Sequence, residues 1–218
     1  MGQYSKKGLY NAYKKNNKER AELDYYSTPT DEVINILNKM QLNFNNQTIL
    51  EPCAGAGHML LGIENYIKDN NMQNVNIIAT DVKDRGIIPQ LENLSIAAGD
   101  EYDFLSDDYP FDVNSVDYII MNPPFSTIEP FVIRSLEIAK KGVLMLGRLQ
   151  FLEARGRYDN IFKDNPPSQV YCYIDRIKCY RNGDLSDTGS SAQAYAWFYW
   201  DLTGDLLKET TLDWISRI

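Results

Sequence analysis

A glycine-rich turn that follows an apolar stretch is the feature that most restricts how this chain can fold. The apolar pair at residues 49–50 is followed by the heptapeptide EPCAGAG at residues 51–57. Glycines after a strand allow the backbone to approach a ligand without side-chain obstruction. Leu60 stands where a dinucleotide-binding turn would have its third glycine, and the turn lacks the Lys-Ser/Thr pair of a phosphate loop. The pattern therefore predicts a strand, a turn and a helix that bind another class of ligand.

Apolar stretches alternate with helical patterns along the rest of the chain. A helix is expected to start within residues 28–31, with Thr28 as its cap. Further helices are expected over residues 58–68, 128–141 and 151–162, and strands over residues 48–51, 75–80, 96–100, 116–121, 142–147, 170–174, 177–180 and 194–200. This alternation indicates an α/β fold with a doubly wound, mostly parallel seven-stranded sheet and helices on both faces. Such sheets bind ligands at the carboxyl ends of their strands.

The length of 218 residues predicts one domain over residues 25–218, preceded by a flexible or loosely helical arm at residues 1–24. One histidine and three cysteines without ligand spacing argue against a metal site, a Ser-His-Asp triad and a disulfide framework. The unpaired cysteines favour the reducing cytoplasm. The sequence contains no apolar stretch of membrane-spanning length and no signal peptide.

The charges are unevenly distributed along the chain. Lysine and arginine total 22 against 30 aspartate and glutamate, which gives a net charge of -8. Basic residues gather near the N-terminus and over residues 134–181, whereas the acidic excess lies between residues 22 and 129. This distribution predicts a face that could meet a polyanion, although an ordinary solvated surface explains it equally well.

Carboxylates follow three of the expected strands. Glu51 opens the glycine turn, Asp81 follows the next strand, and Asp103 lies after the third. Three acids at neighbouring strand ends would repel a pyrophosphate, and they suit a ligand with a sulfonium and an ammonium group but no phosphate. S-adenosylmethionine is such a ligand, and Asp81 stands where a carboxylate can accept both ribose hydroxyls.

The second distinctive stretch is the tetrapeptide NPPF at residues 122–125, at the end of an apolar run. The side-chain oxygen of Asn122 and the carbonyl of Pro123 can accept both protons of an aromatic amine and stabilise positive charge that develops on its nitrogen. Pro124 stiffens the turn, and Phe125 can stack on an extruded base. Asn-Pro-Pro alone also occurs in ordinary turns, so its place after a glycine turn is what favours catalysis.

Together the two stretches resemble motifs I and IV of S-adenosylmethionine-dependent amino methyltransferases, and the NPPF form resembles DNA N6-adenine methyltransferases. The likeness runs from about residue 25 to 201 and includes motif X at residues 25–29; residues 149–153 and 194–198 are similar to small phage-type enzymes. It implies a catalytic methyltransferase domain that transfers a methyl group to the N6 amine of adenine in DNA. The implied catalytic residues are Asn122, Pro123, Pro124 and Phe125. The implied cofactor-binding residues are Tyr26, Thr28, Pro29, Glu51, Pro52, Cys53, Ala54, Gly55, Gly57, Asp81, Val82, Asp103, Phe104 and Asn122.

The resemblance also implies individual roles. Glu51 and the backbone of residues 54–57 would hold the methionine portion of the cofactor, with Asp103 on the exocyclic amine of its adenine and Phe104 beside the ring. The motif order is similar to the gamma-type arrangement, but no block of this sequence is large enough for a separate target-recognition domain. Strong sequence specificity is therefore not expected.

The polymer and the partners stay open at this point. Related motifs act on RNA and on protein glutamine, so methylation of RNA or of a protein side-chain amide is an alternative, as is a catalytically inactive cofactor-binding subunit. DNA is favoured by the NPPF form and by a basic face that includes Lys140, Lys141, Arg148, Arg155 and Arg157. Residues 126–129 and 182–193 are either substrate-contacting loops or plain surface linkers. The sequence does not determine an oligomeric state.

Overall fold

The computed structural model describes residues 25–86, 94–98, 102–181, 183, 186, 193–204 and 209–218. The expected N-terminal arm and most of the loop at residues 182–193 lie outside the described residues. The helical elements are α2 (Thr30–Met40), α3 (His58–Asp69), α4 (Ile128–Ile138), α5 (Arg155–Arg157), the 3-10 turns η2 (Phe125–Thr127) and η3 (Leu149–Leu152), and the π turn η4 (Tyr158–Phe162). The strands are β1 (Tyr26–Ser27), β2 (Thr48–Glu51), β3 (Asn76–Asp81), β4 (Leu94–Ala98), β5 (Val116–Met121), β6 (Ala139–Arg148), β7 (Gln169–Tyr173), β8 (Tyr180–Arg181), β9 (Tyr195–Asp201) and β10 (Thr211–Ile215).

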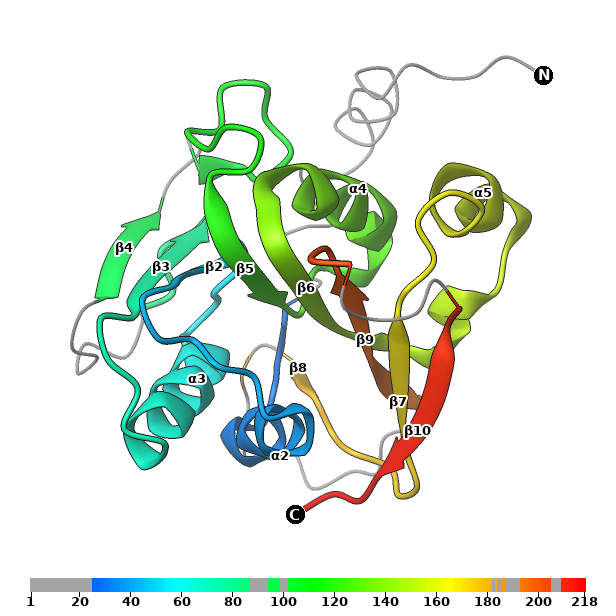
Figure 1. The fold of residues 1–218 in the computed structure, drawn as a ribbon, viewed down its shortest axis with the longest axis horizontal. Helices are drawn as coiled ribbons and strands as arrows, with labels where there is room; N and C mark the ends of the chain where they lie inside the picture. Colours follow the sequence, from blue (N-terminus) through cyan, green and yellow to red (C-terminus); the bar gives the residue numbers. More distant parts are fainter. Residues whose placement is uncertain are drawn as a thin grey trace.

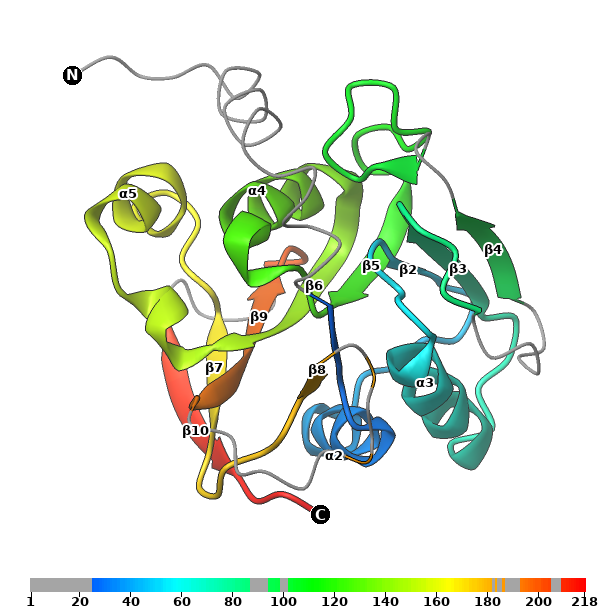
Figure 2. The ribbon, with the colours of Figure 1, turned by 180° about the vertical axis from the view of Figure 1, so that it is seen from behind.

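One large sheet organises the molecule, as Figures 1 and 2 show from opposite sides. Its strand order is β10-β7-β9-β6-β5-β2-β3-β4, and β1 and β8 form a separate antiparallel pair. Every pair in the large sheet is parallel except the two that include β9. The doubly wound, mostly parallel α/β fold expected from the sequence is therefore confirmed.

Each face of the sheet is covered by its own apolar core, because successive side chains on a strand point to opposite faces. On one face, α2 and α3 contribute Val33, Ile36 and Leu60 to a core that includes Ile49 of β2. On the other face, α4 contributes Phe131 to a core with Leu50 and Met121, among other residues. Figure 1 shows α2 and α3 on the opposite side of the sheet from α4.

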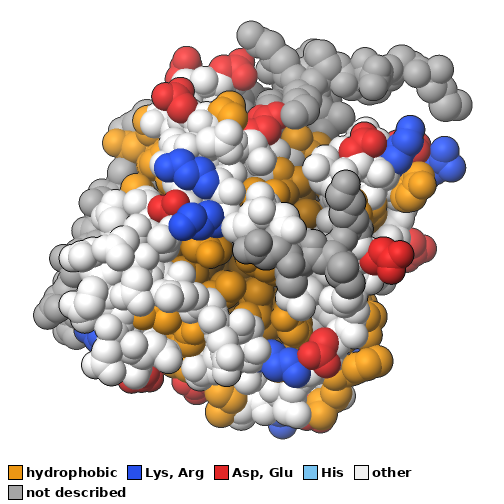
Figure 3. Space-filling view, viewed as in Figure 1, with side chains coloured by type: hydrophobic (Ala, Val, Ile, Leu, Met, Phe, Trp, Pro, Cys, Tyr) orange, Lys and Arg blue, Asp and Glu red, His pale blue; other side chains and the backbone are white. Residues whose placement is uncertain are grey.

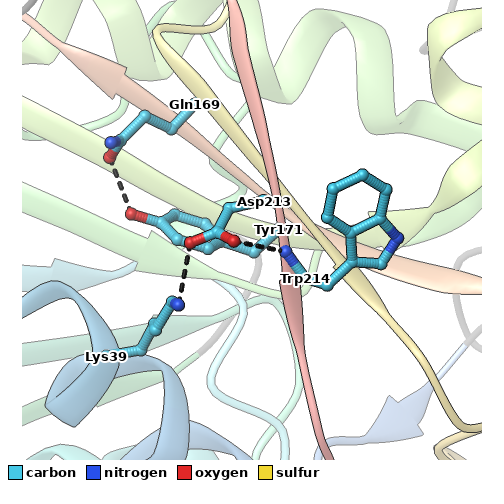
Figure 4. Close-up of polar contacts among 5 residues, drawn as sticks. All are labelled: Lys39, Gln169, Tyr171, Asp213 and Trp214. Atoms are coloured by element: carbon cyan, nitrogen blue, oxygen red, sulfur yellow. Dashed lines mark hydrogen bonds and ion pairs between the residues drawn. The ribbon is translucent and has the colours of Figure 1, made fainter.

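The large sheet has eight strands rather than the expected seven, because β10 adds to one edge. The sequence did not predict β10 because most of its side chains are exposed, so the segment lacks an apolar pattern. Polar contacts on this edge are drawn in Figure 4: Asp213 forms an ion pair with Lys39 of α2 at 2.8 Å and accepts from the amide of Trp214, while Tyr171 donates to Gln169. The hydrogen bond from Lys39 lowers the pKa of Asp213.

Two expected helices differ from the structure. The helix expected over residues 128–141 ends at Ile138, because residues 139–141 join β6 and pair beside β5. The helix expected over residues 151–162 is broken into η3, α5 and η4. Ala154 has φ 130°, which helical backbone does not adopt, and Arg157 donates to the carbonyls of Gln150 and Glu153.

Candidate active site

The predicted site residues gather at one edge of the sheet. β6, β5, β2 and β3 are neighbours and run parallel, so their carboxyl ends lie along the same edge. Glu51 ends β2, Asp81 ends β3, Arg148 ends β6, and Asn122 directly follows β5. Residues that are up to 97 positions apart in the sequence, from 51 to 148, are thus brought to one line of strand ends.

The glycine turn is held in shape from the neighbouring strand. Gly55 and Gly57 have φ values of 57° and 86°, a region that other residues rarely adopt. The amide of Gly55 donates to Oδ2 of Asp81 at 2.8 Å, and the amide of Lys83 donates to Oδ1 at 2.9 Å. Asp81 therefore braces the turn, and its carboxylate retains lone pairs for a further donor. Burial raises the pKa of Asp81 despite these hydrogen bonds.

Tyr25 packs directly on the glycine turn. Its hydroxyl accepts from the amide of Ala56 at 3.1 Å, and the guanidinium of Arg85 lies 4.7 Å from the centre of its ring. A Cβ atom built on Gly55 would lie 2.2 Å from a carbon of that ring. Only glycine fits beneath Tyr25 at this point, which explains the residue type at position 55.

Gly55→Ala is expected to lower the free energy of unfolding by about 2 kcal/mol, since it adds a clash with Tyr25 to the strain of a positive φ. Gly86→Ala is the matched control, because Gly86 has φ 70° with open space around it. That control should cost about 1 kcal/mol. Urea titration of both variants measures the difference, and equal losses would show that the contact with Tyr25 contributes nothing.

Glu51 is a buried carboxylate that has no counter-ion within the described part of the chain. Its side chain is 2% exposed, and Oε2 has no hydrogen-bond partner among the residues that the structure describes. Burial, and then the charge of Asp81, raise the pKa of Glu51 well above its ordinary value. Burial likewise raises the pKa of the Cys53 thiol. The described residues contain no cluster of His, Cys, Asp and Glu suited to a metal ion.

Asn122 is fixed by the segment that precedes α2. Its Nδ2 donates to the carbonyl of Tyr26 at 2.8 Å and to the hydroxyl of Thr28 at 3.0 Å. Both amide protons are used, and Oδ1 is buried with no partner within the described part of the chain. Thr28 was expected to cap α2, but the helix has Pro29 at its N-cap and no side-chain cap. The threonine hydroxyl is directed to Asn122 instead.

The two prolines and Phe125 form the side of the site next to Asn122. The carbonyl of Pro124 accepts from the amide of Thr127 at 3.0 Å, which closes the turn before α4. The ring of Phe125 lies 5.2 Å from that of Tyr26 and 6.0 Å from that of Tyr195. The guanidinium of Arg148 lies 4.1 Å from the centre of the Phe125 ring.

The remaining residues predicted to bind the cofactor differ in how exposed they are. Val82 is 41% exposed beside Asp81, and Asp103 is half-buried, with Oδ1 accepting from the amide of Leu105 at 2.9 Å. Phe104 was expected beside the cofactor's adenine, but it is 1% exposed and packs against Tyr109 and Phe131 in the core. Its ring is therefore not open to a ligand in this structure. An apolar ring is stabilised by such burial.

The five expected basic residues are not gathered in one cluster. Lys140 and Lys141 lie at the start of β6, next to the beginning of β5, whereas Arg148 lies at the other end of the strand. Seven or eight residues of extended chain span roughly 25 Å. Arg155 pairs with Asp159, and Arg157 is bound to backbone carbonyls. On the face in Figure 3, the described basic side chains are scattered among acidic ones.

Sequence reasoning missed the contacts of Tyr25, Tyr195 and Arg148 with the site. Tyr25 lies in the segment that resembles motif X, and Tyr195 lies in a segment that is similar to small phage-type enzymes, but the resemblance does not indicate their contacts with Gly55 and Phe125. Their neighbours Gly55 and Phe125 are 30 and 70 residues away in the sequence, so no local spacing indicates these contacts.

Solved methyltransferase structures share this architecture. A protein described as a class I S-adenosylmethionine-dependent methyltransferase from Listeria monocytogenes has a TM-score of 0.65 at 15% identity, over 96% of this chain and 72% of that one. A protein from Pyrococcus horikoshii that is described as an RNA methyltransferase gives a TM-score of 0.57 at 17% identity, over 90% of this chain and 97% of that one. A modification subunit of a type I restriction enzyme from Vibrio vulnificus gives 0.60 at 12% identity, over 99% and 53%, so this chain spans about half of that subunit. The chain therefore has the fold of class I S-adenosylmethionine-dependent methyltransferases.

The sequence comparison identifies the family within this class. Residues 9–136 match the family described as N-6 DNA methylase, a segment of more than half of the chain that includes the glycine turn and the NPPF stretch. No curated protein matches the sequence. The chain belongs to the N-6 DNA methylase family, and it is an S-adenosylmethionine-dependent methyltransferase that acts on the N6 amine of adenine in DNA.

Proposed function

We propose that the edge formed by β2, β3 and β5 holds the cofactor and the target adenine side by side, with Glu51 and Asn122 as the two acceptors that face them. The observation that carries the proposal is a pair of buried oxygens without partners among the described residues, Oε2 of Glu51 and Oδ1 of Asn122. A buried acceptor without a donor is costly, so such atoms are expected where a ligand supplies the donor.

The residues present fit S-adenosylmethionine. When bound, this cofactor supplies a methyl group activated by attachment to a sulfonium. Glu51 provides a carboxylate for its positive end, and the backbone of the glycine turn allows close approach. Asp81 accepts from the ribose hydroxyls, and Asp103 from the exocyclic amine of the cofactor's adenine. Tyr26, Thr28 and Pro29 line the methionine end, next to Asn122.

The target amine is held by Oδ1 of Asn122 and the carbonyl of Pro123. The Pro124 carbonyl is already bound to Thr127, so it is not available for this role. Two acceptors on the amine protons direct its lone pair at the methyl group and stabilise the charge that develops on nitrogen. Methyl transfer would form a nitrogen–carbon bond as the sulfur–carbon bond of the cofactor breaks, and the nitrogen would then lose a proton to solvent. Phe125 stacks on the target ring, which must leave the base stack to reach the site.

The test is methyl transfer from labelled cofactor to duplex DNA, single-stranded DNA, RNA and protein, followed by nucleoside and amino-acid analysis. We expect label in N6-methyladenine from DNA. Label confined to RNA, or to glutamine in protein, would contradict the proposed substrate.

Further expectations about domain organisation and localisation accompany this proposal. The segment 25–218 acts as one catalytic domain without a separate target-recognition block, which is consistent with a single large sheet that contains every strand from β2 to β10 except β8. The three cysteines are free, as suits the cytoplasm. No helix among the described residues is long and apolar enough to cross a membrane. The likeness to phage-type enzymes stays a prediction.

A further inference from the structure

Arg148 lies against Phe125, the residue proposed to stack on the target base. It ends β6, the strand next to β5, and it is half-buried. Its guanidinium covers the ring of Phe125 at 4.1 Å, and its Nε is buried without a hydrogen-bond partner in the described residues. Tyr195, its partner on β9, is the residue that hydrogen-bonds this side chain.

The charge of Arg148 is not neutralised by the described part of the protein. Among the described residues, ion pairs join Lys39, Lys68 and Arg155 to carboxylates, and none of these pairs includes Arg148. The groups that face Arg148 are neutral near pH 7: burial raises the pKa of the Tyr195 hydroxyl, and that of the Cys179 thiol to about 12. A partly desolvated cation without a counter-ion is costly, so an anion from a ligand would be favoured here.

The guanidinium also restricts the access of a base to the Phe125 ring. It lies at stacking distance from Phe125, whose ring is flanked by Tyr26 and Tyr195. A target base and the guanidinium cannot occupy the same face of Phe125 at once. A base that stacks on this face must therefore displace Arg148.

We infer that Arg148 exchanges partners when a nucleotide enters: its guanidinium leaves Phe125 to the target base and binds the phosphodiester of the same nucleotide. The inference rests on the proposed function, in which Phe125 stacks on the target ring. A nucleotide brings an aromatic amine and, one sugar away, an anion that matches the donors of arginine. A glutamine side chain brings the amide alone. Stacking of the base on Phe125 replaces the cation–π contact that is lost, so the exchange is energetically balanced.

The first test measures how salt weakens binding to a short thymidine oligomer with one central adenine. Each phosphate contact in a single strand contributes about 0.7 to the slope of log affinity against log salt. We expect Arg148→Gln to reduce the slope by about that amount and to weaken binding about tenfold at low salt. Arg148→Lys should keep the slope. Lys140→Gln, at the opposite end of β6, is the control of equal charge change and should match wild type.

The second test replaces one phosphodiester beside the adenine with a neutral methylphosphonate. On one side of the adenine, we expect this change to weaken wild-type binding about tenfold and to have no further effect on Arg148→Gln. Equal losses in both proteins on both sides, or an unchanged salt slope in Arg148→Gln, would overturn the inference. If wild type methylates no nucleic acid, the proposed function fails; if wild type methylates DNA and Arg148→Gln keeps the slope, only the role of Arg148 fails. Calorimetry with the cofactor verifies that each variant is folded.

Discussion

Asn122→Ala is expected to slow methyl transfer by about 100-fold or more, the usual loss when one preorganised polar contact to a transition state is removed. The variant removes Oδ1, the buried acceptor proposed to bind the target amine. Cofactor affinity should change little, because Glu51 and the glycine turn are untouched. Single-turnover transfer of labelled methyl to DNA measures the first quantity, and calorimetry with S-adenosylmethionine the second.

Variants of Thr28 test how far activity depends on the orientation of Oδ1 of Asn122. Thr28→Val removes the hydroxyl that accepts from Nδ2 of Asn122 while it keeps the shape of a side chain that is 2% exposed. Turnover should fall by about tenfold, because the amide loses one of the two contacts that orient it. Thr28→Ser retains the hydroxyl and should recover most of the activity. Unchanged turnover in Asn122→Ala would show that Asn122 does not take part in the reaction.

Glu51→Gln is expected to weaken cofactor binding by about 10- to 100-fold, the value of a hydrogen bond or ion pair with a charged partner. At a pH above the raised pKa of Glu51, the same change should stabilise the free protein by about 1 kcal/mol, since it removes a buried charge with no counter-ion among the described residues. A gain in stability with a loss of affinity distinguishes a ligand-binding carboxylate from a structural one. Thermal unfolding with and without cofactor measures both effects.

The pH dependence follows from the pKa of Glu51. Burial and the charge of Asp81 raise this pKa in the folded protein above its ordinary value of 4.5, so the folded state binds the proton more tightly than the unfolded chain. The destabilisation caused by Glu51 therefore grows as the pH rises from 4.5 through the raised pKa. A cationic ligand favours the ionised form, so cofactor affinity should increase over the same range, with release of a proton.

Other titratable groups near Glu51 also affect the pH dependence of cofactor binding. Comparison with Glu51→Gln separates their contribution from that of Glu51. Asp81 and the neutral groups Cys53 and Tyr25 interact with Glu51, and Arg85 lies on the ring of Tyr25. Calorimetry in buffers of different ionisation enthalpy counts the protons released on binding. Wild type should release more protons than Glu51→Gln, which keeps only the smaller contribution of Asp81. Equal proton release in the two proteins would contradict the assignment of Glu51.

Much of the fold follows from local patterns. The buried strands β2, β3, β5 and β9 were predicted within one or two residues, because apolar runs bounded by turns specify buried strands. β10 was missed because it pairs at an exposed edge. The helix over residues 151–162 was wrong because the backbone leaves the helical region at Ala154 and Arg157 binds the carbonyls of the preceding turn, neither of which a periodicity indicates.

For the candidate site, the sequence predicted which residues meet but not how they are used. Strand ends in a parallel sheet must converge, so Glu51, Asp81 and Asn122 could be placed together in advance. The use of Thr28 as an acceptor for Asn122 depends on a contact between residues 94 positions apart. The burial of Phe104 likewise depends on a distant contact, with Phe131, which lies 27 positions further along the chain.

The two hydrogen bonds from Nδ2 of Asn122 have a consequence for base selection. Because Tyr26 and Thr28 consume both amide protons, the side chain cannot be turned over to offer a donor to an incoming base. A base with an oxo group in place of the amine would direct oxygen at oxygen, and hypoxanthine, the deaminated form of adenine, would be rejected by electrostatic repulsion. With the role proposed for Oδ1, this fixed orientation would select against a carbonyl before any nucleic acid binds.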